Sequence, residues 1–186
     1  MIPSFLEDDA LTAAPQLLGW KLISRTSEGM TSGYIVEVEA YHMDDPASHS
    51  YRGLTPRTAP MFAAAGTIYV YFTYGMHFCL NLVTGPEGQG QAILIRALEP
   101  VDGINLMQQR RGTTSIHNLT NGPAKLTQAM GINRDLTGKR LNEASLSLAS
   151  GLKQGHITQT TRIGISKAVD QPWRFYLTAN PYVSKL

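Results

Sequence analysis

Residues 67–84 read TIYVYFTYGMHFCLNLVT, and this stretch decides the fold. Its two arms alternate in character and meet at Tyr74-Gly75-Met76, so the pattern predicts a β-hairpin whose turn uses the conformational freedom of Gly75. Side chains of a strand point alternately to its two faces, so the first arm carries a core face and a second, tyrosine-bearing face. The core face holds Ile68, Val70 and Phe72, and the other face holds Tyr69, Tyr71 and Thr73.

Tyr74 stands at or beside the predicted turn, where little core is available to bury a large aromatic ring. Two interpretations remain open: the ring folds back onto a neighbouring loop, or it acts as a functional wedge. Single exposed aromatic side chains are ordinary in proteins, so the pattern alone favours the first interpretation.

Upstream of the hairpin, residues 33–41 read GYIVEVEAY and alternate cleanly, which predicts a strand. Glu37, Glu39 and Tyr41 share one face of it. Glu39 is the most interesting carboxylate, because it stands among apolar residues in the middle of the strand. It is either a site carboxylate or, together with Glu37, part of the solvated outer face of an edge strand, and the pattern does not separate these alternatives.

Downstream of the hairpin, residues 91–98 form a strongly apolar predicted strand that only Arg96 interrupts. A charge in such a strand must find a partner. Arg96 therefore pairs with a carboxylate on another strand as a structural element, or orients groups in a site, and the two roles are compatible.

Residues 42–60 lack periodicity and are rich in Pro, Ser, Asp and Gly, which predicts a long loop. Loops of this length inside a compact domain are usually functional or disordered. The loop contains His49, Arg52 and Arg57. His49 is a candidate site residue, although a loop histidine bonded to backbone is the commoner case.

The rest of the chain alternates short helices and strands. Helices are predicted from about residue 8 or 12 to 18, from 102 to 111 with Asp102 as a possible N-cap, and from 121 to 131. Further strands are predicted at 21–26, 145–149, 161–166 and 174–178. With 186 residues, 42% of them apolar, and no repeat or linker, we expect one domain spanning residues 1–186.

Composition excludes several classes of site. The net charge is +2 and the pI is near 8.7, which allows nucleic-acid binding without demanding it. Cys79 is the single cysteine, so an intrachain disulfide and a cysteine-rich zinc site are excluded. The histidines lack the spacing of a metal site, and no nucleophile elbow, phosphate-binding glycine loop or Rossmann fingerprint is present, so we expect neither a metal nor an organic cofactor.

The N-terminal residues MIPSFLEDDA are acidic and lack a sustained apolar run, which argues against a secretory signal. No stretch approaches the length of apolar sequence that a membrane-spanning helix needs. We therefore expect a soluble, cytoplasmic protein with no membrane partner.

Four blocks of this sequence stand out, in this order: EVEAYHMDDPASHSYRGLTPRTAPMF, GTIYVYFTYGMHFCLN, ILIRALEP and NGPAKLTQAMGI. Together they closely resemble the alkyladenine (3-methyladenine) DNA glycosylase family. The likeness runs from roughly residue 10 to residue 184, ending in RFYLTANPYVS, so it covers nearly the whole chain. The resemblance implies an α+β fold: a single mixed α/β domain around a curved, mainly antiparallel sheet with a protruding hairpin.

The resemblance also assigns roles to residues. Glu39 matches the general base that deprotonates a water for attack on the anomeric carbon of the nucleotide, and Arg96 matches the arginine that helps to hold this water. Further matches concern the extruded base and the duplex: Tyr41, His49 and Tyr71 sandwich the base, Asn81 obstructs the exocyclic amine of guanine, and Tyr74 enters the duplex where the base has left.

What the resemblance implies is a monofunctional DNA glycosylase of base excision repair. Its substrates would be alkylated or deaminated purines in double-stranded DNA, namely 3-methyladenine, 7-methylguanine, hypoxanthine and ethenoadenine. No lysine in the resembled motifs matches a Schiff-base nucleophile, so we expect hydrolysis that leaves an abasic site, carried out by a monomer without metal or cofactor.

Two other functions compete with this one. The first is a non-catalytic binder of single-stranded nucleic acid that uses the tyrosine row as a stacking platform and does not need Glu39. The second is a small N-glycoside hydrolase acting on free nucleosides, which would keep Glu39 but have little use for a wedge at Tyr74.

Overall fold

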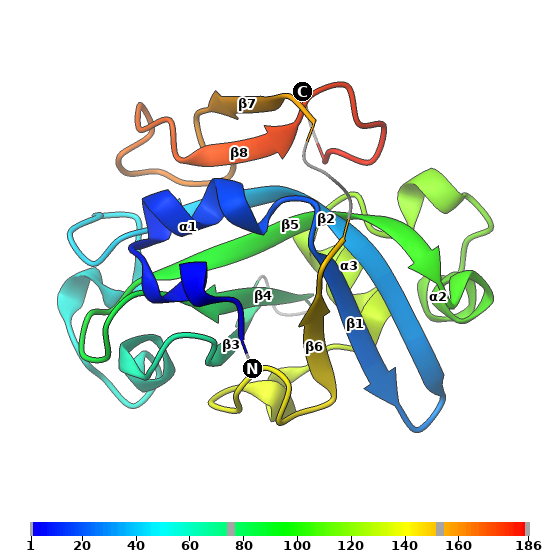
Figure 1. Cartoon of the computed structure of the whole chain (residues 1–186), viewed down its shortest axis with the longest axis horizontal. Helices are drawn as coiled ribbons and strands as arrows, with labels where there is room; N and C mark the ends of the chain where they lie inside the picture. Colours follow the sequence, from blue (N-terminus) through cyan, green and yellow to red (C-terminus); the bar gives the residue numbers. More distant parts are fainter. Residues whose placement is uncertain (1, 74–76, 152–154, 185–186) are drawn as a thin grey trace.

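A computed structural model describes residues 2–73, 77–151 and 155–184 of the chain (Figure 1). Its helices are α1 (Ala10–Leu17), α2 (Ile104–Arg111) and α3 (Pro123–Met130). Its strands are β1 (Lys21–Thr26), β2 (Gly29–Tyr41), β3 (Ile68–Thr73), β4 (His77–Val83), β5 (Ala92–Asp102), β6 (Leu146–Ala149), β7 (Ile157–Thr160) and β8 (Arg174–Leu177). Short 3-10 turns join them: η1 (Ser4–Glu7), η2 (His49–Arg52), η3 (Ala59–Phe62), η4 (Ile116–Asn118) and η5 (Arg134–Leu136).

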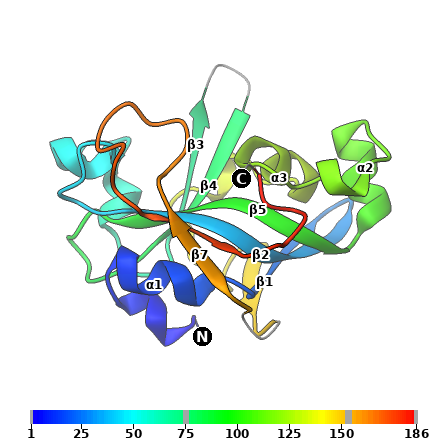
Figure 2. The same ribbon diagram turned by 90° about the horizontal axis from the view of Figure 1, so that it is seen from above.

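The strands form one curled sheet in which every pair of neighbours is antiparallel. The order is β3-β4-β5-β2-β1-β6, and β8 pairs with both β2 and β7. Figure 2 shows the β3–β4 hairpin rising from the sheet on the side of α2 and α3, whereas α1 lies on the opposite side. The α+β architecture with a curved antiparallel sheet and a protruding hairpin is therefore confirmed.

Strand β2 is the centre of this sheet. It pairs with β1 and β8 along one edge and with β5 along the other. Glu37 and Glu39 have no exposed surface, so the alternative that they belong to a solvated edge strand is wrong. The alternation of β2 is confirmed from Val36 onward: Val36, Val38 and Ala40 belong to the apolar core. Before that point it fails, because Ile35 also lies in the core and the register of β2 shifts between Ile35 and Glu37.

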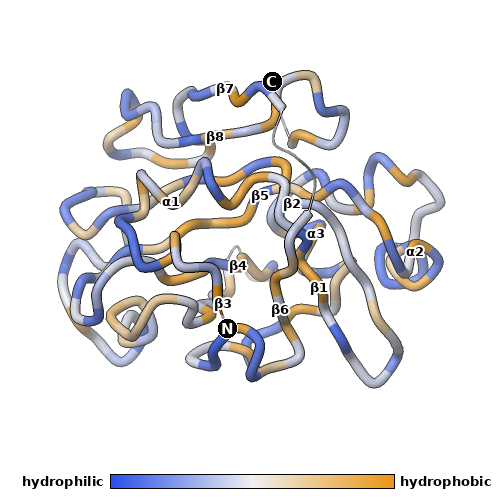
Figure 3. Tube along the Cα trace, in the orientation of Figure 1, coloured by the Kyte–Doolittle hydropathy of each residue, from blue (hydrophilic) through white to orange (hydrophobic). Residues whose placement is uncertain are grey.

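The apolar core lies between the sheet and the helices. Figure 3 shows apolar residues along β4 and β5 in the middle of the molecule, while the peripheral loops are mostly hydrophilic. Helix α1 begins at Asp9, whose carboxylate accepts the N–H groups of Leu11 and Thr12, and it buries Ala10, Ala13, Ala14 and Leu17. Each Leu or Ile fully buried in this core stabilises the fold by about 1.5–3 kcal/mol, so the core holds the sheet rigid beneath the site.

Two predicted elements are wrong in detail. The N-cap of α2 is Gly103 in the left-handed conformation rather than Asp102, whose carboxylate instead binds the Ser32 hydroxyl and Lys21. Residues 161–166 are an irregular loop rather than a strand, because the strand that pairs with β8 comes just before them, as β7. This loop matters for the site.

The hairpin faces are confirmed with one exception. Ile68 and Val70 lie in the core, but Phe72 is 44% exposed and packs against Phe78, with ring centroids 5.1 Å apart. The hairpin protrudes beyond the core at this point, so no core remains for Phe72 to enter.

In the part of the chain that the structure describes, no helix is long and apolar enough to cross a membrane. Among the same residues, no cluster of three His, Cys, Asp or Glu side chains could hold a metal ion.

Candidate active site

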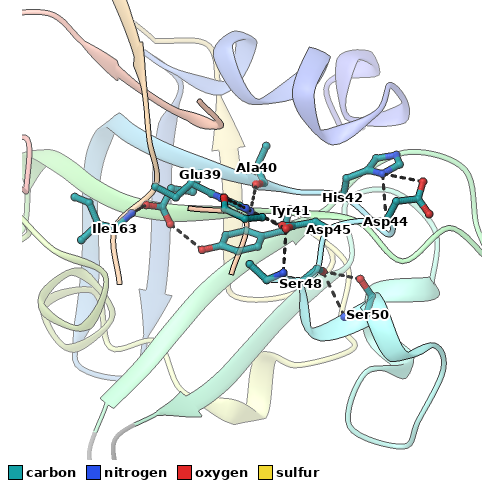
Figure 4. Close-up of polar contacts among 12 residues, drawn as sticks. Glu39, Ala40, Tyr41, His42, Asp44, Asp45, Ser48, Ser50 and Ile163 are labelled. Carbon is teal, nitrogen blue, oxygen red and sulfur yellow. Dashed lines mark hydrogen bonds and ion pairs between the residues drawn. The ribbon is translucent and has the colours of Figure 1, made fainter. Parts of the chain in front are cut away.

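The Glu39 carboxylate is held by donors from three segments of the chain (Figure 4). Its Oε1 accepts the backbone N–H of Ile163 at 2.7 Å and lies 3.2 Å from a terminal nitrogen of Arg96. Its Oε2 accepts the Tyr41 hydroxyl at 2.9 Å. The carboxylate is thus fixed from β2 itself, from β5 and from the loop between β7 and β8.

Arg96 of β5 bridges the two carboxylates of β2. Its Nε donates to Glu37 at 2.9 Å, and this leaves a terminal nitrogen next to Glu39. Burial favours the neutral guanidine, but the charges of Glu39 and Glu37 outweigh it and raise the pKa of Arg96. Arg96 therefore remains a cation although it is buried, and the two carboxylates are the partners that a charge in an apolar strand needs.

Glu37 is itself held by further donors. It accepts a hydrogen bond from Nε of Arg174 at 2.8 Å. The C-terminal segment adds two more, from the Ser184 N–H at 2.6 Å and the Ser184 hydroxyl at 2.9 Å. Removing one partner from such a buried ionic group costs about 3–5 kcal/mol, so Glu37 anchors Arg96 firmly.

The hydroxyl of Tyr41 is a permanent donor to Glu39. Burial, together with the negative charge of Glu39, raises the pKa of Tyr41 far above its ordinary range. On the other side of the ring, the guanidinium carbon of Arg162 lies 4.7 Å from the centroid of Tyr41. Arg162 in turn forms a buried two-point ion pair with Asp45.

A second group of aromatic side chains comes from the hairpin and from η2. The rings of His49 and Tyr71 meet edge to face, with centroids 4.5 Å apart. His49 Nδ1 lies 3.0 Å from the hydroxyl of Tyr69, whose ring is 5.7 Å from that of Tyr71. Desolvation of the histidine ring, reinforced by the positive charge of Arg57, lowers the pKa of His49, although part of the residue is exposed. His49 is therefore mostly neutral at pH 7.

A cavity of about 570 Å³ opens between these groups. One wall comes from the loop after β2, residues 46–49, and another from residues 163–167. The hairpin contributes Tyr69, Tyr71, Thr73, Cys79 and Asn81, and the floor includes Tyr41, Leu94 and Arg96. Glu39 does not line the cavity. It lies directly behind the lining, because its three contacts, Tyr41, Arg96 and Ile163, are all lining residues.

The cavity brings together five of the residues singled out from sequence: Tyr41, His49, Tyr71, Asn81 and Arg96. Asn81 is buried, and its amide nitrogen donates to the backbone oxygen of Tyr69 at 3.1 Å, which fixes the side chain against the cavity. Cys79 is buried.

Tyr74 lies outside the described residues. The strand residues that flank it, Thr73 and His77, form the last described pair of the β3–β4 hairpin. In Figure 2 the loop between β7 and β8 rises beside this hairpin, on the same side of the sheet.

Sequence reasoning missed Asp45, Arg162 and the amide of Ile163. Asp45 stood in a polar loop, and residues 161–166 were expected to form a strand. The available signal was the unpaired charge of Arg162 in a segment expected to be strand, which, like Arg96, demanded a partner.

Comparisons with known proteins identify the family to which the chain is related. The family described as Methylpurine-DNA glycosylase (MPG) matches residues 4–181. A protein of Methanoculleus marisnigri is 53% identical over 187 residues, which cover 98% of this chain and 97% of the relative. A protein of Carboxydothermus hydrogenoformans is 48% identical over 184 residues, covering 97% of this chain and 96% of the relative.

A third relative, from Prosthecochloris aestuarii, is 48% identical over 189 residues and covers all of this chain and 91% of its own. All three carry the name "Putative 3-methyladenine DNA glycosylase". The family match spans most of the chain, and the relatives match it almost end to end. The chain therefore belongs to the methylpurine-DNA glycosylase family and is a DNA glycosylase.

Proposed function

We propose that this chain hydrolyses the N-glycosidic bond of damaged purines in double-stranded DNA, with Glu39 as the general base. The observation that carries the proposal is a buried carboxylate fixed by three donors directly behind the wall of an aromatic cavity. An enzyme carboxylate at such a place is well suited to take a proton from water. A non-catalytic binder would have no use for this arrangement.

The two oxygens of Glu39 differ in what they can still accept. Oε1 already accepts the Ile163 N–H and pairs with Arg96, whereas Oε2 accepts a hydrogen bond only from the Tyr41 hydroxyl among the described residues. An ionised carboxylate offers about four lone-pair sites in all, about two on each oxygen. Oε2 therefore has a site left for a water, and we assign it as the oxygen that takes the proton.

The proposed step balances as a hydrolysis. The water oxygen bonds to the anomeric carbon, the bond from that carbon to the purine nitrogen breaks, and its electron pair leaves with the base. The water proton passes to Glu39. Arg96 balances the carboxylate charge in an interior where an unpaired carboxylate would be very costly.

The cavity supports stacking of an extruded purine. Because His49 and Tyr71 already touch edge to face, no base fits between them, so the slot lies between that pair and Tyr41. Extruding a base costs a few kcal/mol, and stacking on aromatic side chains contributes about 1–3 kcal/mol per base. Purines alkylated at N3 or N7 are cationic, and electron-rich rings attract them further.

The remaining roles belong to the same proposal. Asn81, held by Tyr69, would obstruct the exocyclic amine of guanine, and Tyr74 would fill the gap that the extruded base leaves in the duplex. We propose that the enzyme acts as a monomer.

The test is single-turnover base release from duplex oligonucleotides that carry 7-methylguanine, hypoxanthine, ethenoadenine or a 3-methyladenine analogue. We expect the native chain to release at least one of these bases and Glu39→Gln to lose at least about 10²-fold in rate, the lower end for a general base. Lesion-DNA binding should change little, because glutamine has the same shape.

The products test the rest of the scheme. Release without strand cleavage, and without a protein–DNA adduct on borohydride treatment, is expected of a monofunctional enzyme. A trapped adduct that disappears in Lys167→Ala would instead identify a lysine nucleophile at the cavity. Full activity of Glu39→Gln would remove Glu39 from the mechanism.

A further inference from the structure

Arg162 does not line the cavity, but it contacts several of the segments that surround it. Its side chain is completely buried, and its two terminal nitrogens donate to the two carboxylate oxygens of Asp45. The hydrogen bond from Nη2 to Oδ1 is 3.0 Å long. One of these nitrogens also donates to the backbone oxygen of Ala40 at 3.1 Å. A two-point guanidinium–carboxylate pair fixes direction as well as distance.

Two aromatic rings add to this geometry. The guanidinium carbon of Arg162 lies 4.7 Å from the ring centroid of Tyr41 and 4.9 Å from that of Trp173. Planar guanidinium groups stack on aromatic faces, and a lysine ammonium cannot reproduce both the fork and the stacking.

These contacts join three segments that form the site. Ala40 and Tyr41 end β2, Asp45 precedes the cavity wall at 46–49, and Arg162 precedes the wall at 163–167. The next residue after Arg162 is Ile163, whose N–H donates to Glu39 at 2.7 Å. Figure 4 shows Ile163, Glu39, Tyr41 and Asp45 converging on this point.

We propose that Arg162 is a positioning residue for base excision: it holds the Ile163 N–H on Glu39 and fixes both cavity walls, without touching the substrate. The inference rests on the proposed role of Glu39. A displacement of about 1 Å in a catalytic geometry can cost 10²-fold in rate, so loss of this clamp acts on turnover more than on DNA binding.

Arg162→Lys tests the proposal, because it keeps the charge and removes the fork. Arg110→Lys is the matched control: Arg110 is also largely buried, pairs with Glu28 at 2.8 Å and donates to the backbone oxygen of Ala129 at 3.1 Å, but lies away from the cavity. Each variant is compared with the native chain in thermal unfolding, single-turnover release, affinity for undamaged duplex and hydrogen–deuterium exchange.

We expect Arg162→Lys to lower the single-turnover rate by about 10- to 10²-fold, to speed amide exchange in residues 161–167, and to leave affinity for undamaged duplex unchanged. Arg110→Lys should retain the native rate and the native exchange of that segment. If Arg162→Lys does not fold, Asp45→Asn, which weakens the same fork, is expected to give the same pattern.

The proposal is overturned if Arg162→Lys loses no more rate than Arg110→Lys, or if the rate falls while exchange in 161–167 stays native. Glu39→Gln, measured in parallel, separates a failure of the proposed function from a failure of the positioning role. If Glu39→Gln remains active, the proposed function fails. If Glu39→Gln is inactive while Arg162→Lys is fully active, only the positioning role fails.

Discussion

At the residue scale, we expect the charge state of His49 to affect which class of lesion is released. The lowered pKa of His49 leaves its ring neutral at pH 7, beside a slot proposed to take cationic bases. Below that pKa the ring carries a positive charge and repels a cationic base, but not a neutral one.

We therefore predict that the release rate of 7-methylguanine, relative to that of hypoxanthine, falls as the pH is lowered from 7 to 5. Titration of other groups affects both lesions and cancels largely in the ratio. His49→Gln, which does not titrate, should give a flatter ratio, measured by single-turnover release at each pH. A native ratio that is independent of pH would contradict this role.

The same shift has a consequence for stability. Between its lowered pKa and the ordinary value of about 6.5, the unfolded histidine binds more protons than the folded one. Stability must therefore rise with pH through this window and is lost as the pH falls. Since His49 is partly exposed, the effect of this one group is small.

At the scale of elements, β2 and its partners assemble the ionic groups. Its register sets Glu39 opposite Leu94 of β5 and Arg174 of β8, and irregularities near Glu37 adjust the pairing beside Arg96. The segment after β8 then closes over Glu37 through Ser184. The C-terminal segment is thus part of the support of the site.

Ser184→Ala should therefore affect both stability and rate. The Ser184 hydroxyl donates to Glu37 at 2.9 Å and accepts from a terminal nitrogen of Arg96 at 3.4 Å, so its loss loosens both side chains, although the Ser184 N–H still donates to Glu37. A hydrogen bond to a charged group contributes about 1.5–3 kcal/mol, and we expect the free energy of unfolding in chemical denaturation to fall by about that amount. The single-turnover rate should be several-fold slower. Ser147→Ala, which removes only an exposed contact to Arg25 at 3.3 Å, is the control. Equal behaviour of the two variants would show that the C-terminal segment does not support Arg96.

At the scale of the whole molecule, the loop between β7 and β8 and the β3–β4 hairpin rise on the same side of the sheet (Figure 2). The net charge is only +2, so DNA binding depends on where the cations lie rather than on how many there are. Arg52, Arg57 and Lys167 are exposed on the loops that border the cavity. This side is where we expect the duplex to bind.

Lys167→Ala should weaken binding to damaged and undamaged duplex by the same factor, because a phosphate contact carries no information about the base. The slope of log affinity against log salt should become shallower by about 1, as measured by fluorescence anisotropy over a salt series. Arg25→Ala removes the same charge from an exposed position on β1, which is separated from the hairpin strand β4 by β5 and β2, and should change neither quantity. A loss restricted to damaged DNA would place Lys167 in base recognition instead.

Much of the fold could be predicted because it depends on local patterns. The strand expected at 33–41, the described arms of the hairpin at 68–73 and 77–83, and the Gly-terminated helix expected at 121–131 appear in the structure. The prediction of a strand at 161–166 is wrong. Its apolar residues Ile163 and Ile165 line the cavity, and a short apolar run does not reveal whether it packs into the core or lines a cavity. Domain extent and cytoplasmic location remain predictions.

The sequence by itself determined the hairpin with its tyrosine row, the carboxylates on one face of β2, and the requirement that Arg96 find a partner. Only the tertiary structure decided which residues meet: that Glu39 is central and buried, that Ile163 and Tyr41 share its oxygens, and that Arg162 grips Asp45. The physical reason is that sequence patterns describe neighbouring residues, whereas the site is made by residues far apart in the chain. Periodicity reports the face on which a side chain lies, whereas the contacts of Glu39 with Ile163 and of Asp45 with Arg162 join residues more than one hundred positions apart, which pack only when the sheet curls.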